Sequence, residues 1–106
     1  MRVYIAGPIK GNDSARECFA LAAKMLRDLG KYEVVNPFEL NVSAIEADAG
    51  YAAYMRADLK ALVGCDAIHL LRGWENSAGA RLEFQVAQMC GLLVTYQCAL
   101  GLSLHP

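Results

Sequence analysis

The chain has 106 residues, a formal net charge of −1 and a hydrophobic content of 56%, which fit one domain over residues 1–106 with a thin core. The near-neutral charge argues against a nucleic-acid polymer as partner, but it is compatible with a small ligand that carries one or two phosphates. No apolar run approaches the roughly 20 residues needed to cross a bilayer, so we expect no membrane association.

Apolar periodicity and turn residues predict an alternation of strands and helices. In chain order we expect a strand at Arg2–Ala6, a helix from Ser14 to Gly30, a strand at Tyr32–Val35, a helix at Tyr51–Val63, a strand at Ala67–Leu71, a helix at Ala78–Met89 and a strand at Leu92–Tyr96. The stretch from Phe38 to Gly50 predicts a loop with a helical turn. The tail from Gln97 to Pro106 gives only a weak signal for a short fifth strand.

The first helix shows how its limits and its inward face are predicted. Ser14 and Glu17 have the spacing of a capping box, in which each side chain bonds a free backbone N–H of the first turn. Gly30 closes the helix because glycine readily adopts the left-handed backbone of a helix C-terminus. The expected inward face consists of apolar residues at helical spacing: Cys18, Ala22, Met25, Leu26 and Leu29.

Strands that alternate with helices predict an α/β fold, with a parallel sheet covered on both faces by right-handed crossovers. Ligands of such sheets bind at the carboxyl ends of the strands. Here those ends are Gly7–Gly11, Asn36-Pro37 and Gly73–Gly79, so we expect the two glycine-rich turns to face one crevice. Neither GxGxxG nor GxxxxGK[ST] occurs, which disfavours a dinucleotide or P-loop site.

Glu83 is the leading candidate for chemistry because of the residues that precede it. Ser77 is a good N-cap for the third helix, whose N-terminus offers N–H groups to an anion. Gly79 allows a ligand to approach the backbone closely. Glu83 follows in the second turn, on the face of Gly79, Ala80, Ala87 and Cys90, where a solvated carboxylate is not expected. This arrangement predicts a catalytic site.

Tyr4 and Asp58 are candidates for which the pattern also fits a structural role. Tyr4 lies in the middle of a strand, where it is either a core aromatic or a hydroxyl that reaches the crevice and holds a carboxylate. Asp58 shares a helical face with Tyr51, Tyr54 and Leu62. Because most helical Asp residues are solvated, the pattern alone leaves both roles of Asp58 open.

Further candidates lie near the ends of the strands. The turn Gly7-Pro8-Ile9-Lys10-Gly11 is either a plain strand-to-helix turn or a loop around a sugar or base, with Lys10 as a cation for a phosphate. Trp74 either packs at the strand end or covers a base. His69 lies inside an apolar strand, so we expect a satisfied core histidine rather than a ligand.

The cysteines are Cys18, Cys65, Cys90 and Cys98. They form no CxxC motif and lie within apolar patterns, so we expect reduced core residues of a cytoplasmic protein. The opening Met1–Pro8 is too short and too soon broken for a signal peptide, in line with this localisation. Because no His, Cys and Asp residues have metal-ligand spacing, we expect neither a metal nor another cofactor.

Three blocks, in this order, resemble the nucleoside 2-deoxyribosyltransferase superfamily, and especially its short bacterial and phage members. They are Tyr4-Ile5-Ala6-Gly7-Pro8-Ile9, Asp58-Leu59 upstream of Cys65-Asp66-Ala67-Ile68, and Ser77-Ala78-Gly79-Ala80-Arg81-Leu82-Glu83. The resemblance covers most of residues 1–96. It implies a flavodoxin- or Rossmann-like three-layer sandwich with four to five parallel strands. It also implies a homodimer or higher homo-oligomer whose neighbouring subunit helps to complete the site, and the high apolar content fits such an interface.

The resemblance assigns roles to the candidate residues. In that superfamily a Glu at the position of Glu83 attacks C1′ of a (deoxy)ribose, a Tyr at the position of Tyr4 orients it, and an Asp at the position of Asp58 handles the proton of the leaving base. A small-molecule nucleoside or nucleotide is therefore the expected substrate. The residues expected to bind it are Gly7, Ile9, Lys10, Gly11, Asn36, Ser77 and Gly79.

Ser77 is an informative departure from the transferases. They usually carry an Asp at this position, which binds the 5′-hydroxyl and would repel a 5′-phosphate, whereas Ser77 at a helix N-terminus favours a phosphate. Nucleoside-5′-monophosphate N-glycosidases similar to the superfamily have Ser there, and Lys10 fits the same interpretation. We therefore expect cleavage of (deoxy)ribonucleoside 5′-monophosphates. Base exchange between nucleosides and a non-catalytic nucleotide-binding or sensing module remain alternatives.

Overall fold

The computed structural model describes residues 1–40, 50–98 and 101–104, with the backbone alone at 98 and 101–104. Every strand and helix expected from the sequence is present, with ends that differ by a residue or two. The elements are β1 (Arg2–Ala6), α1 (Ala15–Asp28), β2 (Glu33–Val35), the 3₁₀ turn η1 (Pro37–Glu39), α2 (Gly50–Val63), β3 (Ala67–Leu70), the 3₁₀ turn η3 (Trp74–Asn76), α3 (Ala78–Met89), β4 (Leu93–Cys98) and β5 (Gly101–Leu104). The helical turn expected after Phe38 corresponds in place to η1, whereas residues 41–49 of that predicted loop lie outside the described part.

The strands form one sheet in the order β2-β1-β3-β4-β5. β1 to β4 run parallel, as predicted, and β5 pairs antiparallel with β4. Only residues 99–100 connect β4 to β5. A parallel return needs a crossover of a dozen or more residues, so this short connection forces the fifth strand to run in the opposite direction.

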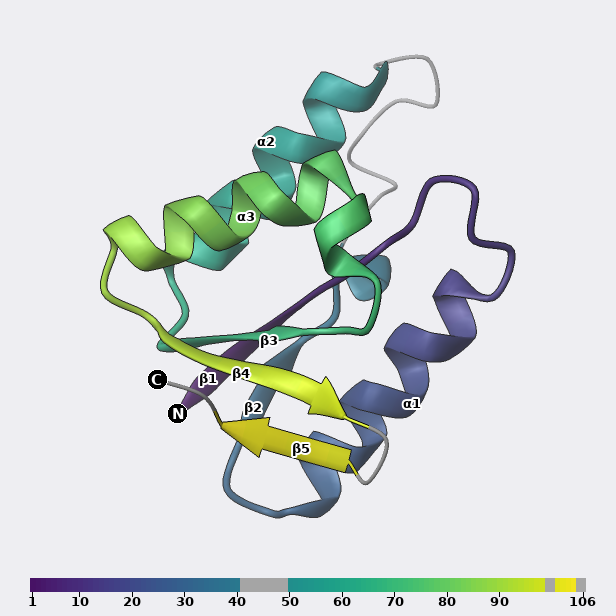
Figure 1. Ribbon diagram of the computed structural model, residues 1–106. Coiled ribbons are helices and arrows are strands. Elements are labelled where there is room, and N and C mark those ends of the chain that lie inside the picture. Colours follow the sequence, from purple (N-terminus) through teal and green to yellow (C-terminus); the bar gives the residue numbers. More distant parts are fainter. Residues whose placement is uncertain (41–49, 99–100, 105–106) are drawn as a thin grey trace.

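Helices cover both faces of the sheet, with α1 on one side and α2 and α3 on the other (Figure 1). The side-chain alternation of β1 supplies both interfaces: Val3 and Ile5 pack toward α1, whereas Tyr4 and Ala6 pack toward α2 and α3. The predicted α/β three-layer sandwich is confirmed. Because alternate residues of β1 face opposite sides of the sheet, only those on the same side as Tyr4 can contact α3.

The details of α1 differ from the prediction. The Ser14 hydroxyl does not cap the helix, because its backbone (φ −96°, ψ 9°) departs from the extended conformation of an N-cap. Asn12 orders this turn instead: its Oδ1 accepts from the N–H of Ser14 at 3.2 Å, and its Nδ2 donates to the carbonyl of Pro8 at 3.1 Å. The buried face is Ala15, Phe19, Ala22, Ala23 and Leu26.

The expectation that the cysteines are core residues is wrong for two of them. Cys18 and Cys90 are exposed, and Cys65 is buried; the side chain of Cys98 lies outside the described part. Cys18 fails because the adjacent, larger Phe19 takes the inward position, and neighbouring helix residues point about 100° apart. Within the described residues, no helix is long and apolar enough to cross a membrane.

Candidate active site

Glu83 lies on the inner face of α3, which begins after Ser77. Ser77 has an extended backbone, and its hydroxyl oxygen accepts a hydrogen bond of 3.2 Å from the N–H of Ala80. The helix cap predicted from the sequence is therefore formed. Helical spacing places Glu83 on the same buried face as Ala80 and Ala87, where only 6% of Glu83 is exposed. Its carboxyl group is thus largely removed from water.

Tyr4 meets Glu83 from the sheet. β1 lies between β2 and β3, and its alternation turns Tyr4 toward the layer of α2 and α3. The side chain is fully buried, and its hydroxyl donates a hydrogen bond of 2.5 Å to Oε2 of Glu83. Both roles that the sequence left open are therefore combined, since Tyr4 fills the core and also holds the carboxyl group.

Asp58 approaches the same pair from α2. Its side chain is half-buried, and this burial raises its pKa to about 6. The charge of Asp58 also raises the pKa of both Glu83 and Tyr4, so the three groups lie within electrostatic range of one another. The fold thus gathers β1, α2 and α3 around one cluster, and Asp58 is not a purely solvated charge.

The pKa values of Tyr4, Asp58 and Glu83 are shifted to different extents. Burial raises the pKa of Glu83 to about 8; the hydrogen bond from Tyr4 opposes this shift and the charge of Asp58 adds to it. Burial and the charge of Glu83 raise the pKa of Tyr4 far above its ordinary value, so Tyr4 remains a hydrogen-bond donor. In the free protein burial therefore favours the protonated form of Glu83 more strongly than that of Asp58. Carboxyl groups with separated pKa values are typical of acid–base sites.

The structure brings the two glycine-rich turns together. A Cβ on Gly7 would lie 2.8 Å from Cβ of Leu71, and a Cβ on Gly73 would lie 3.4 Å from Cγ of Pro8. The first distance is shorter than real carbon contacts allow, so Gly7 is required by the packing of the β1 turn on the end of β3. This structural requirement is independent of any contact with substrate.

The other expected binding residues are more dispersed. Ile9 and Lys10 are exposed in the turn, and Gly11 has a positive φ of 75°, which favours glycine. Asn36 is buried, and its Oδ1 accepts a hydrogen bond of 3.1 Å from the N–H of Phe38, so its acceptor caps η1. The Asn36 acceptor is thus used locally by η1.

Gly79 lies where α2 presses on the first turn of α3. A Cβ at this position would lie 2.8 Å from the hydroxyl of Tyr51 and 3.1 Å from Cε of Met55. Both atoms are the far ends of flexible side chains, so a Cβ at position 79 would displace Tyr51 and Met55 rather than the backbone of α2. The contact also places Tyr51 and Met55 beside the N-terminus of α3, where the sequence predicts substrate.

For both His69 and Trp74 the sequence allowed a purely structural role. His69 is fully buried, and its Nδ1 shares a hydrogen bond of 2.7 Å with Oγ1 of Thr95, but Nε2 has no partner among the described residues. The prediction of a satisfied histidine is therefore only half correct, and burial lowers the pKa of His69 to about 4. Trp74 packs on Phe84 and Tyr96. It is half-buried and lines a surface hollow.

Tyr96 and Gln97, which were not among the residues expected at the site, reach the same edge of the sheet as Trp74. The sequence could have indicated these two residues, because the carboxyl end of the fourth strand lies at the same edge of the sheet as the ends of the other parallel strands. The strand was expected to stop at Tyr96, but β4 continues to Cys98. Among the described residues, no group of His, Cys, Asp and Glu could hold a metal ion.

A family model described as a domain of unknown function, DUF4406, matches residues 1–96. The chain belongs to the DUF4406 family. A comparison with curated proteins finds no match to this sequence.

Two 2-deoxyribosyltransferases resemble the DUF4406 chain in structure. For the enzyme of the psychrotolerant bacterium Bacillus psychrosaccharolyticus the TM-score is 0.70 and the identity 20%, over 91% of this chain and 71% of that one. For the enzyme of Leishmania mexicana the TM-score is 0.65 and the identity 21%, over 99% and 78%. The predicted resemblance is thus confirmed at the level of the fold, which DUF4406 shares with 2-deoxyribosyltransferases.

Proposed function

We propose that this DUF4406 protein breaks the N-glycosidic bond of (deoxy)ribonucleoside 5′-monophosphates, with Glu83 as the nucleophile. The buried hydrogen bond between Tyr4 and Glu83, with Asp58 in electrostatic range, carries this proposal. A buried carboxyl group with a raised pKa beside a second carboxyl group is typical of catalytic sites. The fold shared with 2-deoxyribosyltransferases supports chemistry at C1′ of a nucleoside.

The reaction has two steps in this proposal. The Glu83 carboxylate forms a bond to C1′ while the bond from C1′ to the base nitrogen breaks, and the bonding electrons leave with the base. Asp58, in its protonated form, donates a proton to the departing base. Water then attacks C1′ and loses a proton to Asp58, which releases the sugar phosphate and restores the Glu83 carboxylate.

The proton must leave Glu83 as the first step proceeds. In the free protein Glu83 has a pKa of about 8 and Asp58 one of about 6, which is the reverse of the roles required. A sugar that develops positive charge at C1′ lowers the pKa of the adjacent Glu83, because an opposite charge favours the ionised carboxylate. The proton then passes to Asp58, where the leaving base needs it. Tyr4 keeps its own proton and steadies Glu83 throughout.

The N-terminus of α3 supports the preference for a 5′-phosphate. A helix start leaves several N–H groups without helical partners, and the Ser77 cap satisfies only that of Ala80. The remaining N–H groups and the positive end of the helix dipole favour an anion. The Ser77 hydroxyl hydrogen can donate to a phosphate oxygen as well. An Asp at position 77 would set a carboxylate against that phosphate.

Base exchange between 2-deoxyribonucleosides is the second candidate, and the fold shared with two 2-deoxyribosyltransferases favours it. It uses the same first step, and a second base replaces water as the acceptor. The two reactions differ in the acceptor of the sugar, which is water or a second base, and in whether the substrate carries a 5′-phosphate.

The test is incubation with matched nucleosides and 5′-monophosphates of each common base, with and without a free acceptor base, followed by chromatography. Base release from the monophosphates alone supports the proposal. Exchange products from unphosphorylated nucleosides would replace it by base exchange. Tight calorimetric binding of nucleotides without turnover over a day would show a binding module instead. Glu83→Gln is the inactive control.

A further inference from the structure

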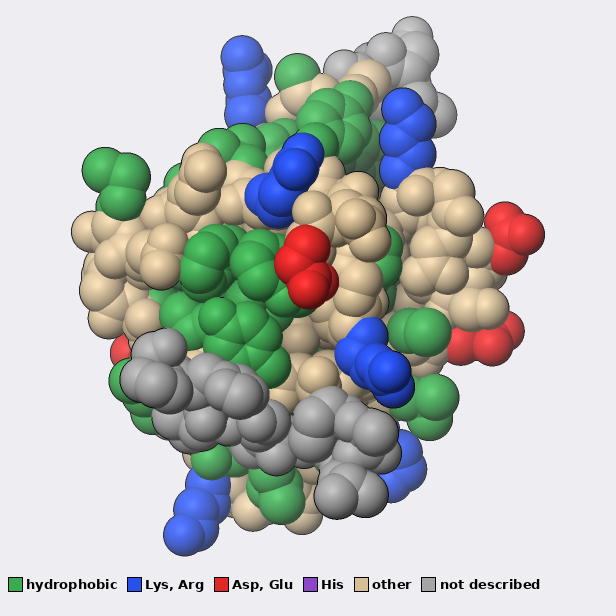
Figure 2. All heavy atoms as spheres, in the orientation of Figure 1, with side chains coloured by type: hydrophobic (Ala, Val, Ile, Leu, Met, Phe, Trp, Pro, Cys, Tyr) green, Lys and Arg blue, Asp and Glu red, His purple; other side chains and the backbone are tan. Residues whose placement is uncertain are grey.

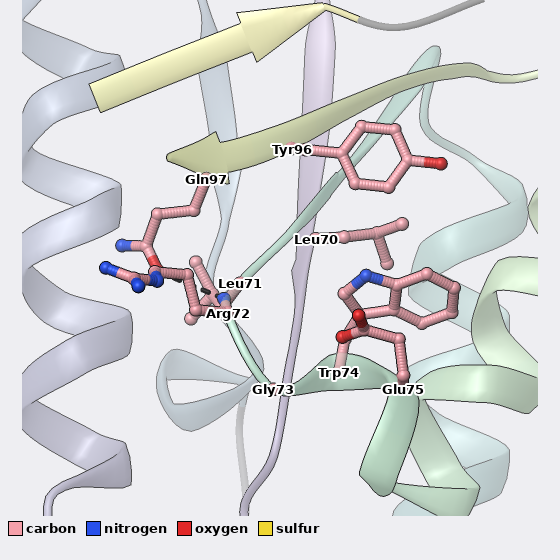
Figure 3. A pocket seen from close by; sticks show the side chains of 8 residues that line it. All are labelled: Leu70, Leu71, Arg72, Gly73, Trp74, Glu75, Tyr96 and Gln97. Carbon is pink, nitrogen blue, oxygen red and sulfur yellow. Dashed lines mark hydrogen bonds between the residues drawn. The ribbon is translucent and has the colours of Figure 1, made fainter. Parts of the chain in front are cut away.

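Hydrophobic side chains gather over the space between α3 and β4, with acidic and basic side chains close by (Figure 2). At the carboxyl ends of β3 and β4 the surface forms a hollow of about 240 Å³ (Figure 3). Its lining includes none of Tyr4, Asp58 and Glu83. This hollow is therefore distinct from the cluster to which we assign the reaction.

Helix α3 separates the hollow from the cluster of Tyr4, Asp58 and Glu83. Glu83 and Phe84 are consecutive, and consecutive helix residues point about 100° apart. Glu83 bonds Tyr4 on β1, whereas the Phe84 ring packs on Trp74 with centroids 4.8 Å apart. The active-site cluster and the aromatic group around Trp74 thus lie on different flanks of the same helix.

The hollow has an aromatic side and a polar side. The rings of Trp74 and Tyr96 occupy one side, with centroids 6.3 Å apart and an angle of 48° between their planes (Figure 3). Leu70 is buried next to these rings and supports them from the core (Figure 3). Half-buried aromatic rings at the wall of a hollow offer stacking surface to a flat ring system.

The polar side offers both donors and an acceptor. Arg72 and Gln97 lie opposite the rings, and Gln97 is held in place because its Oε1 accepts a hydrogen bond of 3.1 Å from the backbone N–H of Arg72 (Figure 3). That contact leaves the Gln97 amide hydrogens as donors. Within the described residues, neither the Arg72 guanidinium nor the Glu75 carboxylate forms an ion pair. Arg72 and Gln97 thus bring donor groups to one side of the hollow, and Glu75 brings an acceptor to the side of Trp74 (Figure 3).

We propose that this hollow binds one free nucleobase, outside the catalytic cluster. A cavity of about 150 Å³ holds benzene and drug-sized ligands need about 300 Å³ or more, so a space of about 240 Å³ suits a ring system without its sugar. The edge of a base carries donors and acceptors side by side, which matches Arg72, Gln97 and Glu75. The Glu75 carboxylate disfavours a phosphate-bearing ligand at the same place. The inference does not depend on the proposed reaction.

Trp74 makes the proposal directly measurable, because it is the only tryptophan of the chain. Adenine and cytosine are titrated into Glu83→Gln protein while Trp74 fluorescence is recorded, so that no turnover interferes. We expect saturable quenching, and inorganic phosphate should give none. Quenching by phosphate, or no saturable change at millimolar base, overturns the proposal.

Substitutions decide where the base binds. Tyr96→Leu should weaken base binding about 5- to 160-fold, the range for loss of one stacking ring. Arg72→Ala should weaken it several-fold, and because Arg72 is exposed this variant keeps its fold. Arg81→Ala, which removes an exposed arginine outside the hollow, is the matched control and should change nothing. Binding that responds to Asp58→Asn, but not to Arg72→Ala or Tyr96→Leu, would place the base beside Glu83 and refute the proposal.

Discussion

The stability of the protein should fall as pH rises toward 8, because of Glu83. Its pKa is raised from 4.5 to about 8 on folding, so between these values the folded protein binds a proton that the unfolded chain has released. The unfolded state then binds fewer protons, and the free energy of unfolding decreases with rising pH. Glu83→Gln cannot titrate and keeps an amide oxygen that accepts from Tyr4. Its stability relative to wild type should therefore increase across this window.

The size of the effect follows from the pKa values. One pKa unit corresponds to about 1.4 kcal/mol, so a rise from 4.5 to about 8 gives at most about 5 kcal/mol between the two ends of the window. Asp58, with its pKa raised from 3.8 to about 6, destabilises both proteins over a lower range and largely cancels in the comparison.

Urea unfolding followed by circular dichroism, at several pH values across this window, measures the difference. Glu75→Gln, at an exposed carboxylate, is the matched control and should follow wild type at every pH. If the stability difference between Glu83→Gln and wild type is the same at all pH values, Glu83 is not a buried group that resists ionisation. The reasoning about its protonation would then fail.

Four further outcomes follow from the structure. Glu83→Gln should lower base release by several orders of magnitude while the fold is kept; activity of Glu83→Ala close to wild type would remove Glu83 from the mechanism. Ser77→Asp should lower kcat/KM for monophosphates far more than for unphosphorylated nucleosides, and equal losses would make Ser77 a helix cap only. Because burial lowers the pKa of His69 from 6.5 to about 4, the unfolded chain takes up this proton first as pH falls, and acid should cost up to about 3 kcal/mol of stability in that range; His69→Gln should lose this dependence in urea unfolding. Light scattering at micromolar concentration should show a dimer or higher oligomer, with the exposed Tyr51 and Tyr54 of α2 as the contact surface; a fully active monomer would exclude it.

Sequence patterns predicted those features that depend on periodicity. The alternation of strands and helices gave the sheet and its layers, and the small neighbours of Glu83 indicated a buried carboxylate. The position of Asp58 could not be derived in this way, because helical spacing does not say which element packs against a face. Its place near Glu83 depends on how α2 and α3 pack, which is a tertiary property.

The errors have equally specific physical causes. The inward face of α1 was misplaced because Cys18 and Phe19 are adjacent and both apolar, and the larger ring took the interior. The Ser14 hydroxyl was expected to cap α1, but the local backbone is set by Asn12. Nothing in the composition of the tail distinguishes a parallel from an antiparallel fifth strand; the short connection decides it.

The contact of α2 with Gly79 sets a rule for redesign. The side chains beside the first turn of α3 come from α2, with Tyr51 and Met55 reaching the position that a Cβ on Gly79 would fill. Gly79 itself has no side chain that could be shortened. Room for a bulkier substrate at this helix end therefore depends on where Met55 and Tyr51 turn, and a library that varies only α3 would leave these two side chains of α2 unchanged.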